Sequence, residues 1–555
     1  MKRILSGALL LSCLILFLGS CKKASDNARH IPQDASAVFS VDLASIGKKL
    51  AWDILFGSDI FKEMTKSMGK DSSNMKDLQN AGIDFLNTFY SYTATDKRYA
   101  GEQRFAALIP LSDKGKWEAY VKKTLPAAKL KTVGDRTEAM LNESVYGGWD
   151  GDLLILMNTV TKEQALSADG NYVPPVTDEI QTAAEMENAF KLEEKNSIAA
   201  NKHFSKLVKE GHDISLFVNY ENILNSYGAS MMGGLAPTAE MTKDAAFTSG
   251  FDFEKGAIKG DMKYYVSNEL KAVSKDLMSG NPDKEMIQRL PAGSMNLLAA
   301  MAISPTALKT LLDRFNMLGF LNIGLSEQGL TADDIFESFT GDIAFSMNNF
   351  KLVMKKTGYS YYNDQMEMVT DTVNDYKPEM DWLYVMKINK QDKFDKIMAV
   401  ATKMSILQAG ADGSYTISGD SSMSMIVKDK YLVVANKAEA GNAYMSGANK
   451  NQQMHEVAEK HVYDHPMSVF FDAKKMFEAV GPETMDNEKE AATFAEVKKV
   501  FDNAILSGGE YKEDAFKYEL SINFNNKEEN SLLQLIQMAN KISEIENKKP
   551  QVAAR

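Results

Sequence analysis

The chain has 555 residues, a formal net charge of −12 and 25% charged residues. By length it is ample for two to four domains with sizeable cores. Its acidic balance argues against a nucleic-acid-binding protein and against a body that lies flat on an anionic membrane.

The first 21 residues carry the most specific signal in the chain. Lys2 and Arg3 precede an apolar run at residues 4–18, and Gly19-Ser20-Cys21 follows it. A basic start, an apolar region and small residues at its end are typical of a secretory signal peptide. The run is shorter than the roughly 20 residues that a membrane span needs. The cysteine after the small residues resembles that of a bacterial lipobox, which implies cleavage after residue 20 and acylation of Cys21.

Cysteine usage fits this interpretation. Cys13 lies inside the signal peptide, so the mature chain keeps Cys21 alone, and lipid would occupy its sulfur. We therefore expect no disulfide, no thiol nucleophile and no cysteine metal site.

Two halves of the remaining chain repeat strand-like and helix-like segments in the same order. A strand that leads into a helix begins after Pro32 and again after Pro291. The next strand in each half, at 105–111 and 383–388, is followed by a polar turn and an amphipathic helix. The turn Ser112-Asp113-Lys114 is expected to supply the N-cap of the first helix, and Asn389 that of the second.

Later segments extend the match. Asn158 corresponds to Asn436, His212 corresponds to His465, and each half closes on Ser-Gly and alternating strands. In the last strand, apolar residues alternate from Phe516 to Phe524, which predicts one buried face and one wet face. We expect an α+β fold, a tandem duplication of two similar modules, each a largely antiparallel sheet covered by helices. The expected divisions are a signal peptide (1–20), a tether (21–30), a first module (31–285), a second module (286–545) and a polar tail (546–555).

The mature chain as a whole resembles a known group. The lipobox, the opening IPQDASAVFSVDL at 31–43 and the repeated strand-then-helix pattern are similar to Bacteroides-type lipoproteins of unknown function. The resemblance implies a place in the envelope of Gram-negative anaerobes and brings no catalytic residues. In that group acidic residues just after the lipid-bearing cysteine are associated with surface export. Here Lys22 and Lys23 precede a single acid, Asp26, which favours the periplasmic side of the outer membrane over the cell surface.

Histidine gives no support for a metal site. The six histidines lack zinc-ligand spacing such as HExxH. His461 and His465 are spaced for one helix face, but Pro466 disfavours helical geometry at His465. We expect no metal and no cofactor.

Serine and lysine motifs give one weak assembly. Ser45 to Lys48 matches S-x-x-K, Ser346 to Asn348 matches S-x-N, and Lys356 to Gly358 matches K-T-G, the trio of penicillin-interacting serine enzymes. About ten residues separate the last two, which is too close for that family, and Ser67 to Lys70 is a second S-x-x-K. A pair of catalytic carboxylates among 75 acidic residues cannot be identified from sequence and stays open.

Tyrosine-rich segments before equivalent strands are the candidate binding sites. Exposed aromatic rings stack on sugars and peptides at little entropic cost. The same alternation is typical of an ordinary strand, and the 32 methionines could line an adaptable groove or simply fill cores. The candidate residues are Tyr90, Tyr92 and Tyr99 in the first half and Tyr359, Tyr361 and Tyr362 in the second.

Two function classes follow. The first is a lipid-anchored envelope protein that binds or scaffolds a protein, peptide or glycan without catalysis. The alternative is a hydrolase of envelope polymers or glycans that uses paired carboxylates or, less favoured, a Ser/Lys site. The repeat favours the first, because it recurs in strands and helices and not in a set of reactive residues.

Overall fold

The structure is a computed structural model that describes residues 26–50, 54, 80–95, 103–162, 176–224, 239–278, 280–363, 365–410 and 413–547. Cys21, Tyr99 and the second S-x-x-K lie outside these residues. The chain divides into two compact units, which we describe separately. Unit 1 contains Met1–Ser226 and Ala246–Asp252, and unit 2 contains Tyr227–Ala245 and Phe253–Arg555. The predicted module boundary at 285/286 stays a prediction.

Unit 1 is built on an antiparallel sheet. Hydrogen-bond register gives the strand order β4-β5-β6-β7-β3-β2-β1-β10-β11. The strands are β1 (Ala35–Asp42), β2 (Thr88–Thr95), β3 (Gln103–Pro110), β4 (Lys131–Val133), β5 (Arg136–Met140), β6 (Val145–Trp149), β7 (Leu153–Asn158), β10 (Ile214–Asn219) and β11 (Ala246–Glu254). The main helices are α2 (Leu43–Lys49), α6 (Lys114–Thr124), α7 (Glu179–Phe190) and α8 (Lys202–Glu210).

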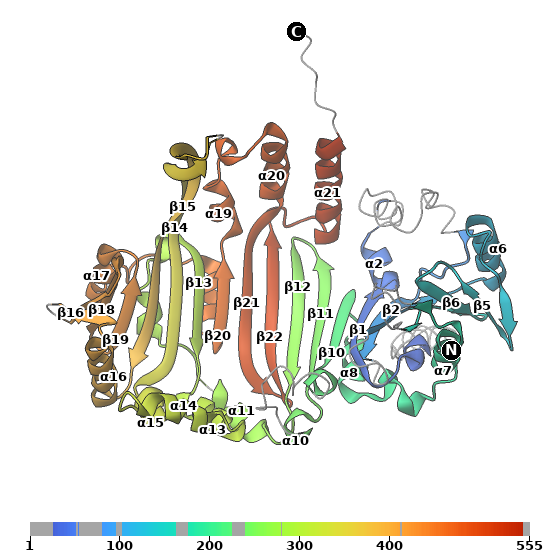
Figure 1. Cartoon of the computed structure of the whole chain (residues 1–555), viewed down its shortest axis with the longest axis horizontal. Coiled ribbons are helices and arrows are strands. Elements are labelled where there is room, and N and C mark those ends of the chain that lie inside the picture. Colours follow the sequence, from blue (N-terminus) through green and yellow to red (C-terminus); the bar gives the residue numbers. More distant parts are fainter. Residues whose placement is uncertain are drawn as a thin grey trace, which may run out of the picture. The chain divides into compact units, whose positions relative to one another are not determined.

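Unit 2 is also an antiparallel sheet with helices (Figure 1). Its strand order is β16-β17-β18-β19-β15-β14-β13-β20-β21-β22-β12. The strands are β12 (Ala257–Tyr265), β13 (Met295–Ala302), β14 (Phe339–Tyr362), β15 (Met368–Ile388), β16 (Leu407–Ala409), β17 (Ser414–Ile417), β18 (Asp420–Lys428), β19 (Tyr431–Ala435), β20 (Met467–Phe471), β21 (Phe501–Lys512) and β22 (Ala515–Phe524). The helices used below are α11 (Lys271–Leu277), α12 (Lys284–Gln288), α13 (Pro305–Arg314), α14 (Met317–Ser326), α15 (Ala332–Phe336), α16 (Gln391–Lys403), α17 (Ala438–Ser446), α18 (Glu456–Val462), α19 (Ala473–Glu478), α20 (Glu488–Val500) and α21 (Ser531–Asn547).

The α+β class that we predicted is therefore confirmed. The nine-strand order of unit 1 also recurs in unit 2, with β16–β19, β15, β14, β13, β20 and β21 in the places of β4–β7, β3, β2, β1, β10 and β11. Single contacts recur as well. Asn158 accepts a hydrogen bond from the backbone amide of Phe105, and Asn436 accepts one from Trp382. A tandem duplication is the origin that we propose for this correspondence.

Helices cover one face of the unit 2 sheet. Residues of α12, α17 and α18, among them Met286, Tyr444 and Val462, form one core with Leu298 and Phe470 of the strands. Figure 1 shows α13–α15 at one end of the strands and α19–α21 beyond the other. α21 packs mainly against α20.

The caps of the two equivalent helices differ. Asp113 caps α6 by accepting a hydrogen bond from the Lys116 amide at 3.0 Å, as predicted. Asn389 does not cap α16, because its side chain donates to the Glu337 carbonyl instead and Lys390 holds the N-cap position. Within the described residues, no helix has both the length and the apolar character that crossing a bilayer requires.

Candidate binding surfaces

Strands β14 and β15 continue past the rest of the sheet as a two-stranded ribbon, which Figure 1 shows beside the label β14. β14 pairs with β13 only as far as Asn348, and β15 pairs with β19 only from Leu383 onward. Within the described residues, 351–362 and 368–379 pair only with each other. We call these two segments and the turn between them the projecting hairpin. The main-chain groups along its two outer edges have no strand partner among the residues that the structure describes.

The end of the projecting hairpin exposes aromatic and sulfur-containing side chains. Tyr361 is 44% exposed, Tyr362 66% and Met366 79%, and Met368 and Tyr359 are exposed as well. The rings of Tyr359 and Tyr361 stack with centroids 5.7 Å apart. Three of the six predicted tyrosines are therefore exposed at the end of the hairpin, with Tyr359 and Tyr361 on one side of the ribbon and Tyr362 on the other.

Charged side chains cross-link the base of the hairpin. Glu379 on β15 bonds Lys355 at 2.9 Å and Lys351 at 3.4 Å, and Lys377 pairs with Asp375. These lysines lower the pKa of both carboxyl groups. Exposed pairs of this kind contribute little stability. On the side of the ribbon that carries Tyr359 and Tyr361, the register places Asp371 directly opposite Tyr359.

The first-half tyrosines have a different environment. Tyr90 and Tyr92 are each 3% exposed, and Tyr90 packs against Phe204. Burial raises the pKa of Tyr92 to about 12. Both are core residues of unit 1, although Tyr90 also lines a hollow beside His212. Tyr99 lies outside the described residues.

The serine and lysine motifs do not assemble. Ser346 is fully buried on β14, while Lys356 lies ten residues further along the same strand, in the projecting hairpin. At about 3.3 Å per residue the two are about 30 Å apart, so they cannot share one catalytic site. Ser45 lies in the first turn of α2, where its amide donates to the side chain of the N-cap, Asp42.

His461 and His465 do come close, with stacked rings 5.7 Å apart. His461 bonds Ser507, and His465 bonds the carboxylate of Glu510 at 2.7 Å. Burial, His465 and Lys460 lower the pKa of His461. No cluster of three or more metal-ligating side chains occurs among the residues that the structure describes.

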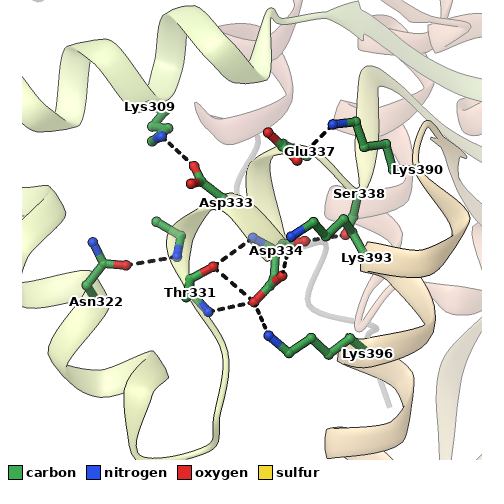
Figure 2. Close-up of polar contacts among 11 residues, drawn as sticks. Lys309, Asn322, Thr331, Asp333, Asp334, Glu337, Ser338, Lys390, Lys393 and Lys396 are labelled. Atoms are coloured by element: carbon green, nitrogen blue, oxygen red, sulfur yellow. Dashed lines mark hydrogen bonds and ion pairs between the residues drawn. The ribbon is translucent and has the colours of Figure 1, made fainter.

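The densest polar cluster of unit 2 centres on Asp334 (Figure 2). Its carboxylate is 1% exposed and bonds Lys393 at 2.9 Å and Lys396 at 2.5 Å, both on α16. It also accepts hydrogen bonds from the amide and hydroxyl of Thr331, the cap of α15. The two lysines hold the pKa of Asp334 well below its usual range. These contacts tie α15 to α16, and we assign them a structural role.

A hollow of about 590 Å³ adjoins this cluster and is lined by two carboxylates, Glu337 and Asp342. Glu337 pairs with Lys390 at 3.0 Å, and Asp342 accepts from the Thr340 hydroxyl and the Asp283 amide. Both carboxylates are thus held by neighbouring groups. This geometry gives the hydrolase alternative no specific support.

Comparisons with known proteins add little. No family model and no curated protein matches the chain. Among solved structures, crystal form IV of TP0453 is similar over 47% of this chain and 88% of that chain, with 10% identity and a TM-score of 0.25. Crystal form III of TP0453 gives 44% and 82% coverage, 8% identity and a TM-score of 0.24. We draw no functional argument from a likeness at this level.

Sequence reasoning missed the methionines that complete the tip of the hairpin. Met366 lies in the turn and Met368 begins β15, next to the exposed tyrosines. The sequence signal that could have found them is the length of the two alternating apolar-polar segments on either side of residues 363–367. These segments are too long to pair along their whole length with neighbouring strands, so their ends must extend past the sheet.

Proposed function

We propose that this protein is a lipid-anchored component of the cell envelope that binds an extended segment of a partner protein at the projecting hairpin, without catalysing a reaction. One observation carries the proposal. A two-stranded ribbon, whose outer edges pair with no other strand in the described part of the chain, presents Tyr359, Tyr361 and Tyr362 to solvent.

The unpaired edges suit strand addition. When an extended segment pairs with a sheet edge, main-chain hydrogen bonds supply affinity and side-chain contacts supply specificity. A two-stranded hairpin by itself is at best marginally stable in water, so a third strand would stabilise it. This chemistry favours a polypeptide over a glycan, because a glycan cannot pair with a strand edge.

The exposed rings suit an anchoring role. A tyrosine ring contributes large contact area while ordering only two side-chain torsions. Burial of exposed Tyr and Met side chains beside a strand would add the apolar contacts that main-chain pairing lacks.

The expected lipid at Cys21 supports the location. Several acyl chains, at about 0.8 kcal/mol per buried methylene, would hold the protein at the membrane durably. With a single acid after the anchor, we place the protein on the periplasmic side of the outer membrane.

Crosslinking in the native envelope tests the proposal. The full chain and a Tyr359→Ser, Tyr361→Ser, Tyr362→Ser variant are crosslinked in cells and purified, and copurifying proteins are identified. Ile180→Ser, at a position that is 86% exposed on α7, is the matched control for loss of exposed apolar surface. We expect a specific protein with the wild type and the control and at least a tenfold loss with the triple variant.

Three outcomes contradict the proposal. The first is copurification that the triple variant leaves unchanged. The second is recovery of glycan with no protein partner. The third is cleavage of peptidoglycan or glycans by the purified full chain, which would restore the hydrolase alternative.

A further inference from the structure

Three rows of apolar side chains cross the unit 2 sheet on the face opposite α12, α17 and α18. Strand register places neighbouring strands' residues side by side along each row. The two flanking rows, two residues away along each strand, include Met386, Ile343 and Met301 on one side and Trp382, Met347 and Leu297 on the other. The central row consists of Tyr384, Phe345, Ala299, Val469, Leu506 and Leu520. We call this surface the open face.

All six side chains of the central row are partly exposed. Their neighbours along the strands, such as Val385, Ala344 and Ala300, point to the other face and are fully buried. An alternation in which both faces are apolar and only one is covered is unusual, because a soluble sheet normally turns polar side chains to water. Exposed apolar surface of this extent marks an interaction site.

Two helices stand on the open face at its margins. α16 packs Phe394 and Met398 against a cluster that includes Met425 and Leu432, at the β18–β19 margin. Residues 264–278, which include α11, pack against Met467 and Tyr518 at one end of the strands. The Asp334 contacts of Figure 2 fix α16 in this place. α16 and residues 264–278 therefore border the open face at two margins. We call the open face between them the floor and these two segments its walls.

The floor offers almost nothing polar to a ligand. Its main-chain amides and carbonyls are already hydrogen-bonded, because β14, β13, β20 and β21 each pair with a strand on both sides. Tyr384 is one of the few polar side chains of the rows, and burial raises its pKa. Methionines recur across the floor, and their flexible side chains adapt to ligands of variable shape.

The dimensions match those of acyl chains. Seven strands from β15 to β12 contribute to the rows, and six gaps of about 4.8 Å give a floor about 29 Å long. Three rows at two-residue spacing span about 13 Å along the strands. A bilayer core two chains deep is about 30 Å thick, so one extended chain is about 15 Å long. Two chains fit side by side with room to spare.

We propose that the open face binds the two acyl chains of a single diacyl phospholipid molecule. An acyl chain needs burial and no hydrogen bonds, which is what this floor supplies at about 25 cal/mol per Å² of apolar surface. The proposal rests on the noncatalytic binding role proposed above and adds a second ligand to it, at a surface other than the hairpin.

Other occupants fit the floor less well. A peptide or glycan would leave its polar groups without partners there. A second copy of the sheet would have to approach to about 10 Å, the ordinary distance between packed sheets, and a helix on the same face is itself about 10 Å across. The walls therefore hinder face-to-face packing of two copies.

Unit 1 repeats the feature. Phe39 of β1 lies beside Leu216 of β10 and Ser91 of β2, in the register places of Ala299, Val469 and Phe345. Phe39 is 41% exposed and Phe105 58%. An open apolar face thus recurs in both units, although the proposal concerns unit 2.

A lipid-extraction assay tests the proposal. The full chain with Cys21→Ala, which removes the covalent lipid, is incubated with phosphatidylcholine vesicles whose acyl chains carry bromine, a tryptophan quencher. The vesicles are then removed by sedimentation. We expect about one lipid per chain in the supernatant and quenching of Trp382, which Trp382→Phe removes.

Ala299→Glu places a charge in the central row, and Ala448→Glu makes the same change at an exposed position outside the open face. We expect Ala299→Glu to lower lipid retention at least tenfold and Ala448→Glu to leave it unchanged. Circular dichroism checks that each variant is folded. Leu520→Lys serves as a second variant if Ala299→Glu does not fold.

Four results would overturn the proposal: no lipid retained by the parent chain, equal retention by folded open-face variants, association only with intact vesicles, or a dimer that Ala299→Glu dissociates. If lipid fails to bind while the hairpin still captures a protein in cells, the proposed function stands and this inference alone falls.

Discussion

Phe345 and Trp382 stack across β14 and β15 on the open face, with ring centroids 6.5 Å apart and planes 29° from parallel. Both rings are partly exposed. Pairs of this kind contribute about 0.5–1.5 kcal/mol beyond their area burial. Two large aromatic side chains thus pack against each other on a sheet face of the kind that a layer of helices or a second sheet ordinarily covers.

This arrangement predicts a difference between the two faces of the sheet. Phe470, which is 1% exposed, lies under the helices. We expect Phe470→Ala to cost about 3–5 kcal/mol and Phe345→Ala only about 1–2 kcal/mol, because a partly exposed ring leaves no closed cavity. Urea unfolding of the two variants measures both values. Equal costs would mean that the open face is covered.

Asp334 predicts a dependence of stability on acid. Its pKa is lowered by Lys396 and Lys393, so its contribution is complete above the unfolded value near 3.8 and is lost as pH falls through the folded pKa. We expect Asp334→Asn to cost about 2–3 kcal/mol, at the low end for a buried charge because both lysines are partly in water. The difference from wild type should be constant from pH 8 to pH 5 and shrink below pH 4. A difference that grows on acidification would contradict the ion-pair account.

His212 predicts the opposite trend. Carboxylates of Glu210 and Asp252 raise its pKa, with Asp252 at 2.7 Å from Nδ1. The stabilisation is therefore complete below the unfolded value near 6.5 and is lost as pH rises through the folded pKa. We expect His212→Asn to cost about 1–2 kcal/mol at pH 5.5 and less at pH 9, measured by urea unfolding.

His30 is the internal control for that measurement. Burial lowers its pKa, and its Nδ1 lies 3.0 Å from the Ala189 carbonyl. Stability that depends on neutral His30 is present above pH 6.5 and declines as pH falls. Parallel trends for His212→Asn and His30→Asn would mean that the measured effect is global and does not arise at His212.

The proposed acylation of Cys21 predicts that substitution of this cysteine changes where the protein is found in the cell. We expect Cys21→Ala to abolish incorporation of labelled palmitate and to prevent recovery of the processed chain in the outer-membrane fraction, because the proposed lipid would supply the anchor. Ser20→Ala, one residue earlier, keeps a small residue before the cut and should label normally. Labelling of Cys21→Ala would rule out the proposed acylation site.

Local patterns were enough to predict the order of elements. Asn158 and Asn436 were matched from sequence, and each accepts an amide hydrogen bond from the neighbouring strand. His212 and His465 were also matched, and each bonds a carboxylate at 2.7 Å. Such residues sit next to turns, where a short segment determines its own geometry.

Alternation could not predict which apolar faces are covered. Leu520 and Ile522 alternate with polar residues, which predicted a buried row, but both are partly exposed on the open face. In the same way, Tyr90 and Tyr361 occur in similar segments, yet one is core and the other is exposed. Periodicity predicts that a strand has an apolar face. Whether that face is buried depends on helices that lie far away in the sequence.

The most direct test of the binding role is a photo-crosslinking amino acid placed at Tyr361 in the native envelope, with the same group at Ile180 as control. The account predicts one prominent protein adduct from position 361, and predicts that position 180 does not give this adduct. The crosslink should map to an extended segment of the partner. Absence of a protein adduct at 361, or the same adducts at both positions, would contradict it.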